Sequence, residues 1–253
     1  MIQSRRRFLA TSAATVGGVT FLPYMAQAAD TFSSDAGDIT IHPIEHASFV
    51  METPLGTIHV DPVGEASAYA DLPAPELILI THEHGDHYNV DTLTALAGEN
   101  TRIISNPAVH DMMPPELQEK TTAIGNGENA SWGDLGISAI PAHNTTEDRM
   151  QFHPPGRDNG YVLDFNGFRV YISGDTEDIP EMRALENIDL AFVCMNLPFT
   201  MDATAAASAV LEFQPTYVYP YHYHGRDGGT QDPAEFAGLV GEVSEVKMGN
   251  WYG

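Results

Sequence analysis

The feature that most constrains this chain is a cluster of polar side chains placed directly after an apolar segment. Leu77–Thr81 has the length and the branched aliphatic residues of a buried strand, and the hexapeptide His82-Glu83-His84-Gly85-Asp86-His87 follows at once. Burying so many imidazoles and carboxylates at the end of a strand costs free energy unless a cation pairs with them. The sequence therefore predicts a metal site at this point of the fold.

The spacing within the hexapeptide favours two neighbouring metal positions. In an extended segment alternate side chains lie on one face, so His82 and His84 can converge on one ion. Gly85 permits a sharp turn that directs Asp86 and His87 toward a second position. Imidazole ligands suit zinc, iron or manganese, and added carboxylates extend the choice toward harder ions.

The rest of the chain indicates one folded unit. From residue 37 onward short apolar segments alternate with amphipathic ones, without an internal repeat or a linker. We expect a helix from about Ala203 to Phe213 that is capped by Asp202, and another that begins at Asp232-Pro233. A weaker helix, Val90–Ala97, is expected after Asn89. Many strands with interspersed helices predict a single layered α/β domain over residues 29–253.

The first 28 residues are expected to be an export signal rather than part of the fold. Ser4-Arg5-Arg6-Arg7-Phe8-Leu9 resembles a twin-arginine signal, and Ala26-Gln27-Ala28 is typical of a cleavage site. The apolar stretch between them is short and interrupted by polar residues, so we expect no stable membrane insertion; an uncleaved anchor or amphipathic helix is the alternative. The expected location of the mature protein is the periplasm.

Composition narrows the partners and the chemistry. The formal net charge of -24 disfavours nucleic acid and anionic lipid surfaces, so we expect a small-molecule substrate. The chain has one cysteine, Cys194, in an apolar segment, and no Gly-x-Ser-x-Gly motif. Covalent catalysis therefore has no candidate nucleophile, which leaves a metal-activated water. The sequence does not indicate an oligomeric state.

The motif His-x-His-x-Asp-His after a hydrophobic strand resembles the signature of the metallo-β-lactamase superfamily, and the resemblance extends over nearly all of residues 39–252. It implies a four-layer αββα sandwich, in which two mixed sheets carry helices on their outer faces. It also implies a dinuclear site, with His82, His84 and His143 on one ion, Asp86, His87 and His222 on the other, and Asp175 and a hydroxide between them.

Several positions of this implied site have neighbours that could take the same role. His153 is a rival for His143, which we favour as the ligand, and His224 lies two positions beyond the favoured His222. His46 is expected in the pocket or as a structural histidine. Asp61, in Val60-Asp61-Pro62, resembles an aspartate of the family that hydrogen-bonds to the metal ligands. If His143 and His222 are the ligands, we expect His153 and His224 to lie in the pocket.

Within the superfamily the chain is most similar to the branch of ascorbate-6-phosphate lactonase and N-acyl-phosphatidylethanolamine phospholipase D. The resemblance implies hydrolysis of an ester-type bond in a phosphodiester, a lactone or a thioester, with two divalent ions, zinc first and manganese or iron as alternatives. Asp86 is the expected proton acceptor. β-Lactam hydrolysis is not expected, because Asp175 stands where antibiotic-hydrolysing members usually place a cysteine. The alternatives are an iron redox protein of the same fold and a catalytically silent metal-binding protein.

Overall fold

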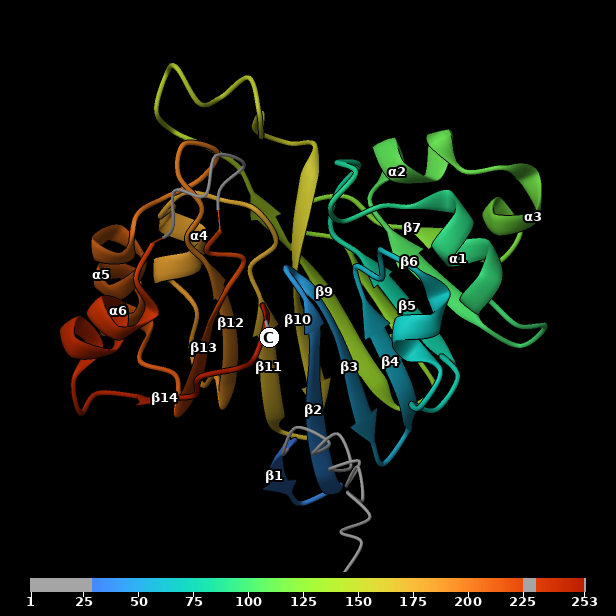
Figure 1. Cartoon of the computed structure of the whole chain (residues 1–253), viewed down its shortest axis with the longest axis horizontal. Helices are drawn as coiled ribbons and strands as arrows, with labels where there is room; N and C mark the ends of the chain where they lie inside the picture. The colour runs from blue at the N-terminus through green and yellow to red at the C-terminus, as the bar shows by residue number, and fades with distance from the viewer. Residues whose placement is uncertain (1–28, 225–230, 253) are drawn as a thin grey trace, which may run out of the picture.

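Two seven-stranded sheets face each other in the computed structural model, which describes residues 29–224 and 231–252 (Figure 1). The expected export signal lies outside the described residues. The first sheet contains β1 (Asp30–Ser34), β2 (Gly37–Glu45), β3 (Ser48–Thr53), β4 (Gly56–Val60), β5 (Leu77–Ile80), β6 (Arg102–Ser105) and β7 (Thr121–Ala123). The second contains β8 (Asn129–Trp132), β9 (Leu135–Ala142), β10 (Asp158–Phe165), β11 (Phe168–Ile172), β12 (Leu190–Cys194), β13 (Tyr217–Tyr221) and β14 (Glu245–Val246).

Helices cover the outer face of each sheet. The first sheet is flanked by the 3-10 helix η1 (Ala66–Tyr69) and by α1 (Val90–Leu96), α2 (Pro107–Met112) and α3 (Pro115–Gln118); the second is flanked by α4 (Pro180–Arg183), α5 (Ala203–Phe213) and α6 (Pro233–Val240) (Figure 1). The predicted four-layer αββα sandwich is therefore confirmed. In the described part of the chain, no helix has the length and hydropathy needed to cross a membrane.

The expected helix starts are present with their caps. The side chain of Asn89 accepts hydrogen bonds from the peptide N–H groups of Asp91 and Thr92 at the start of α1. Asp202 accepts from the N–H of Ala205 at the start of α5, and Asp232 caps α6 in the same way. These side chains satisfy N–H groups that have no partner inside the helix, which fixes where each helix begins.

Both sheets change from antiparallel to parallel pairing along their strand order. In the first sheet β1 to β4 pair antiparallel and β4 to β7 pair parallel; in the second β8 to β11 pair antiparallel and β11 to β14 pair parallel. The carboxyl ends of parallel strands in α/β sheets are where ligands bind. Loops that follow β5, β11 and β13 are therefore the places to look for a site.

Aromatic side chains fill the space between the sheets. The ring of Phe49 on β3 stacks on that of Phe192 on β12 with centroids 4.1 Å apart, and Phe192 stacks on Tyr219 of β13 at 5.1 Å. Trp251, near the C-terminus, is buried against Phe49 and Tyr221. These contacts hold the two sheets together and bring the C-terminal residues to the end of β13.

Candidate metal centre

The histidine motif follows β5 as a tight, largely buried loop. His82 and His87 are fully buried, and Nε2 of His82 lies 3.1 Å from Nδ1 of His84. The Nδ1–H of His82 donates to Thr81 Oγ1 at 3.0 Å, which leaves Nε2 with its lone pair toward His84. The two imidazoles therefore present nitrogens to one point in space.

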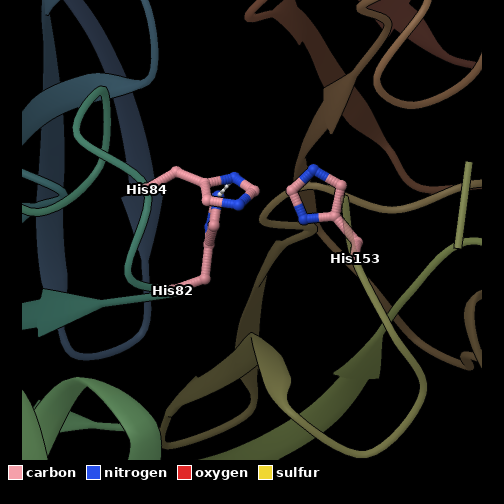
Figure 2. Close-up of side chains that lie close together, drawn as sticks. All are labelled: His82, His84 and His153. Atoms are coloured by element: carbon pink, nitrogen blue, oxygen red, sulfur yellow. Dashed lines mark hydrogen bonds between the residues drawn. The ribbon is translucent and has the colours of Figure 1, made fainter. Parts of the chain in front are cut away.

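His153 supplies the third imidazole of this group. Figure 2 shows its ring facing those of His82 and His84 from the opposite side, and the ligand-capable atoms of the three lie within 4.8 Å of one another. His153 lies on the loop between β9 and β10, and its Nδ1 contacts Asp158 Oδ2 at 3.1 Å. That carboxylate holds the ring so that Nε2 faces the site, 3.4 Å from Asp175 Oδ2.

The geometry favours His153 over the expected His143, since no group of three candidate donors in the described residues includes His143. The peptide N–H of His143 donates to Thr176 Oγ1, and its carbonyl accepts from Thr176 Oγ1 and from the N–H of Glu177. These bonds fix the chain directly after β9 beside the loop that follows β11. The N–H of Asn144 donates to the carbonyl of His153 at 2.8 Å, so the loop returns and brings His153 to the site instead.

His87 belongs to a second group of donors, with His82 and Asp175. Its Nδ1–H donates to Asp61 Oδ2 at 2.8 Å, and its Nε2 faces Asp175 Oδ1 at 3.4 Å. Asp61 is itself fully buried and accepts from the peptide N–H and the hydroxyl of Thr81, each at 2.7 Å. Asp61 therefore lies behind the motif and orients both His87 and Thr81.

Asp175 projects between the two sides of the cluster from the end of β11. The preceding Gly174 has φ +60°, and a Cβ there would lie 2.8 Å from the carbonyl oxygen of Asn159 and 3.1 Å from Cβ of Thr81. Only glycine permits this turn without displacing the backbone. Burial would raise the pKa of Asp175, but the imidazoles of His222 and His87 outweigh it and hold the pKa well below the ordinary value.

His222 follows β13 and completes a third group, with Asp86 and His46. Its Nε2 lies 3.4 Å from Asp175 Oδ2 and 3.5 Å from Asp86 Oδ2. The amide of Asn196 contacts its Nδ1 at 3.1 Å and so fixes the ring. Burial lowers the pKa of His222, but Asp175 and Asp86 outweigh it and raise the pKa to about 10. The structure therefore brings His222, rather than His224, into the donor cluster.

The side chain of His46 contacts members of the donor cluster directly. Its Nε2 is 3.3 Å from Asp86 Oδ2, its ring centroid is 3.8 Å from that of His222, and its Nδ1 lies 2.9 Å from the hydroxyl of Tyr252. The residue has φ 58°, in the turn between β2 and β3. Hydrogen bonds from both imidazoles overcome the effect of burial and lower the pKa of Asp86.

A cavity of about 620 Å³ opens beside the cluster. It is lined by His46, His84, Gly85, Asp86, Phe152, His153, Asp175, Asn196, Phe199 and His224. His224 lies on this wall, where its ring stacks on Tyr252 with centroids 3.6 Å apart. The donors are thus accessible to a small molecule from one side, while Asp61 and Asp158 support them from behind.

The atoms that face the centre of the cluster fit a metal. Of the buried side-chain atoms without a hydrogen-bond partner among the described residues, three belong to the donor groups: Nε2 of His87, Nε2 of His153 and Oδ1 of Asp175. Leaving buried polar atoms unpaired is costly, and each of these has a lone pair. Imidazole nitrogens and carboxylate oxygens in overlapping groups are ligands that divalent transition metals accept.

Comparison with known proteins agrees with this fold. The model of the beta-lactamase superfamily domain matches residues 40–222, well over half of the chain. The chain belongs to the metallo-β-lactamase superfamily. A solved structure from Parabacteroides distasonis, described as that of a metal-dependent hydrolase, shares 39% identity with a TM-score of 0.78 and covers 87% of this chain and 97% of its own.

Other members of the superfamily extend the likeness. The UPF0173 metal-dependent hydrolase TK0141 of Thermococcus kodakarensis is 29% identical over 209 residues, which are 79% of this chain and 92% of that protein. Igni18, a metallo hydrolase from Ignicoccus hospitalis, has a TM-score of 0.69 at 22% identity, covering 83% of this chain and 94% of its own, and so shares the fold.

Two features of the site could not be read from the sequence. The entry of His46 into the donor cluster depends on its left-handed backbone and on contacts with the far end of the chain. Tyr252, whose hydroxyl contacts His46 and accepts from the N–H of His224, had no sequence signal beyond its place in the terminal Trp251-Tyr252 pair. The sequence analysis expected His46 in the pocket or as a structural histidine, and gave no sign of its contact with Asp86.

Proposed function

We propose that this protein is a dinuclear metal-dependent hydrolase that cleaves an ester-type bond. The observation that carries the proposal is the adjacency of the three donor groups: two of them share His82, and contacts of Asp175 with His87, His153 and His222 join all three. A single ion cannot use donors on both sides of Asp175 at once, whereas two neighbouring ions can. Zinc suits the imidazole-rich set best, with manganese or iron as alternatives.

The proposed assignment takes its first set of ligands from the donor group His82, His84 and His153 and its second from the resemblance to the superfamily. His82, His84 and His153 would hold one ion, Asp86, His87 and His222 the other, and Asp175 would lie between them. When bound, two such ions supply a water of lowered pKa and neutralise charge on the attacking and leaving oxygens. Histidine ligands must keep their outer nitrogens protonated, and the Asp61 and Asp158 carboxylates provide acceptors for His87 and His153.

Asp86 is placed to move a proton as well as to bind. Its side chain is 47% exposed and lines the cavity, so it can contact the attacking water, whereas Asp175 is buried. The contact with His46 Nε2, which is not a proposed ligand, would help to keep the Asp86 carboxylate ionised and ready to accept. The buried Cys194 is not a rival nucleophile, because burial raises the pKa of its thiol to about 12.

The experiment that tests the proposal measures bound metal and turnover together. His84→Ala and Asp175→Asn are expected to lower the metal content and to abolish hydrolysis across a panel of phosphodiesters, lactones and thioesters, while the far-UV circular dichroism stays as in the wild type. Wild-type turnover in either variant would show that the reaction occurs elsewhere. Redox-active iron without hydrolysis, measured anaerobically, would favour an oxidative reaction instead.

We propose further that residues 1–28 direct export of the folded protein through the twin-arginine route to the periplasm. The support is the sequence alone, in which Ser4-Arg5-Arg6-Arg7-Phe8-Leu9 resembles a twin-arginine signal and Ala26-Gln27-Ala28 is typical of a cleavage site. Replacing Arg5 and Arg6 together by lysine should leave the full-length protein in the cytoplasmic fraction. Export unaffected by that change would contradict the proposal.

A further inference from the structure

The cavity beside the donor cluster has an aromatic wall. Phe152 and Phe199 meet edge to face, with ring centroids 5.0 Å apart and planes at 81°, and neither side chain is fully buried. Both line the cavity, and the ring of His224 adds a further flat surface to its lining. Two half-covered phenylalanines beside a polar cluster can gain apolar contact from a bound molecule.

The wall is built on the loops that carry the donors. Phe152 directly precedes His153 in the chain. The N–H of Phe199 donates to the carbonyl of Asn196, whose side chain contacts His222. The carbonyl of Phe199 accepts from the side chain of Asn144 at 2.6 Å. A group held against these rings is therefore kept at a fixed distance from the reacting centre, as a substrate must be.

Among the described residues, the lining offers an anionic group no positive side chain other than its histidines. Apart from histidines, the charged residues of the cavity wall are Asp86 and Asp175, both within the donor cluster. Two arginines on the nearby loop are already paired: Arg149 with Glu177 at 2.7 Å and Arg157 with Asp158 at 2.6 Å. The whole chain carries a formal charge of -24, which also repels anions.

We infer that the substrate is an uncharged carboxylic ester or lactone with a flat apolar group that packs against Phe152 and Phe199. This inference rests on the proposed hydrolytic function and narrows it from ester-type bonds in general. In the reaction one water adds to the acyl carbon, the acyl C–O bond breaks, and the products are the carboxylic acid and the alcohol. For a phosphodiester the described wall adds no positive side chain beyond the proposed ions and the histidines, whereas its aromatic rings suit an uncharged ester.

The test uses the zinc-loaded full chain and three small substrates. Methyl acetate and methyl phenylacetate differ only in a phenyl ring, and methyl phenyl phosphate carries the same ring on an anionic phosphodiester. Product formation is followed by liquid chromatography. We expect the ring to raise kcat/KM for the carboxylic ester about tenfold or more, mainly through KM, as apolar contacts of this size do.

Variants then ask whether the aromatic wall causes the preference. Phe152→Ala and Phe199→Ala should each lower about tenfold the ratio of kcat/KM for methyl phenylacetate to kcat/KM for methyl acetate. If the alanine variants do not fold, Phe→Leu at the same positions removes the ring and keeps apolar volume. Phe168→Ala, at the start of β11 and outside the cavity lining, is the matched control and should keep the wild-type ratio.

The outcomes separate this inference from the hydrolase proposal. The inference is overturned if methyl phenyl phosphate is the only one of the three substrates that is hydrolysed. It is also overturned if the rate of ester hydrolysis depends neither on the phenyl ring of the substrate nor on the wall variants. Either result leaves the hydrolase proposal standing. Calorimetric binding of phenylacetamide, which resists hydrolysis, requires no turnover and should weaken about tenfold in both wall variants. If that binding is found while no ester is cleaved, the hydrolase proposal alone fails.

Discussion

Replacing Asp61 by asparagine should disable the metal centre without touching a proposed ligand. Asp61 Oδ1 accepts from the peptide N–H of Thr81, while Oδ2 accepts from the Thr81 hydroxyl and from His87 Nδ1. The peptide N–H fixes the orientation of the new amide, because its oxygen must remain the acceptor there. The amide NH₂ then occupies the position of Oδ2 and faces two groups that donate in the native protein.

This reversal changes the tautomer of His87. To accept from the amide, Nδ1 must lose its hydrogen, which places a hydrogen on Nε2, the atom that faces Asp175 at 3.4 Å. The Thr81 hydroxyl also loses its acceptor, and this hydroxyl is the partner of His82 Nδ1. One substitution thus disturbs a histidine of each proposed ion.

Loss of a supporting carboxylate of this kind lowers metal affinity about 10- to 100-fold, or roughly 1.4–2.7 kcal/mol per ion. Zinc content after dialysis against a graded chelator, measured by mass spectrometry, should show that shift, and kcat/KM should fall at least about 100-fold. Asp164→Asn is the matched control, since Asp164 on β10 accepts a hydrogen bond from the N–H of Gly167 away from the site. An Asp61→Asn protein that retains both ions and turns over within twofold of the wild type would refute the argument.

Five further outcomes are expected. His153→Ala should remove about half of the bound metal and His143→Ala should not, and the opposite result by metal analysis would restore the role expected for His143. Metal affinity measured by calorimetry should rise up to about tenfold per pH unit between pH 6.5 and 10. The reason is that the metal displaces a proton from His222, whose pKa is raised to about 10. An affinity that does not change with pH would contradict this. By the same shift, protonated His222 stabilises the metal-free protein fully below pH 6.5, and that stability is lost as the pH rises through about 10. Removing metal that was present at about 1,000 times its dissociation constant should lower Tm by about 8–16 °C, as scanning calorimetry with and without chelator would show. Tyr252→Phe removes the hydroxyl beside His46 and should lower kcat about three- to tenfold with little change in KM, whereas an equal loss in KM would place Tyr252 in substrate binding instead.

The part of the site that the sequence predicted is the part that is local in the chain. The alternation of side chains after the four-residue buried strand is enough to bring His82 and His84 together, and the turn at Gly85 predicted a neighbouring position for His87. Asp175 and His222 were assigned by the resemblance to the superfamily, and each follows an apolar strand of a parallel array. The pattern of short buried strands with capped helices between them predicted a single layered α/β domain, and the resemblance supplied its four-layer arrangement.

The part that could not be predicted depends on loop closure. His143 directly follows β9 and so satisfies the same rule as the other ligands, yet its peptide is bonded to Thr176 and Glu177. Nothing in the sequence reveals the return of the loop that brings His153 opposite His84. His46 has a comparable explanation, because its position requires a positive φ and a backbone bond from its N–H to Trp251.

The placement of the site at the seam between the sheets links its chemistry to the stability of the fold. The motif after β5 belongs to the first sheet, whereas Asp175 and His222 follow β11 and β13 of the second. Without a metal, carboxylates and imidazoles from the two sheets must pair with each other, as the raised pKa of His222 and the lowered pKa of Asp175 indicate. Because those pairs cross the seam, a change that separates the sheets breaks the cluster, and a change that neutralises the cluster weakens the seam. Metal binding at the proposed site would therefore add a further link between two layers that the aromatic core already holds together.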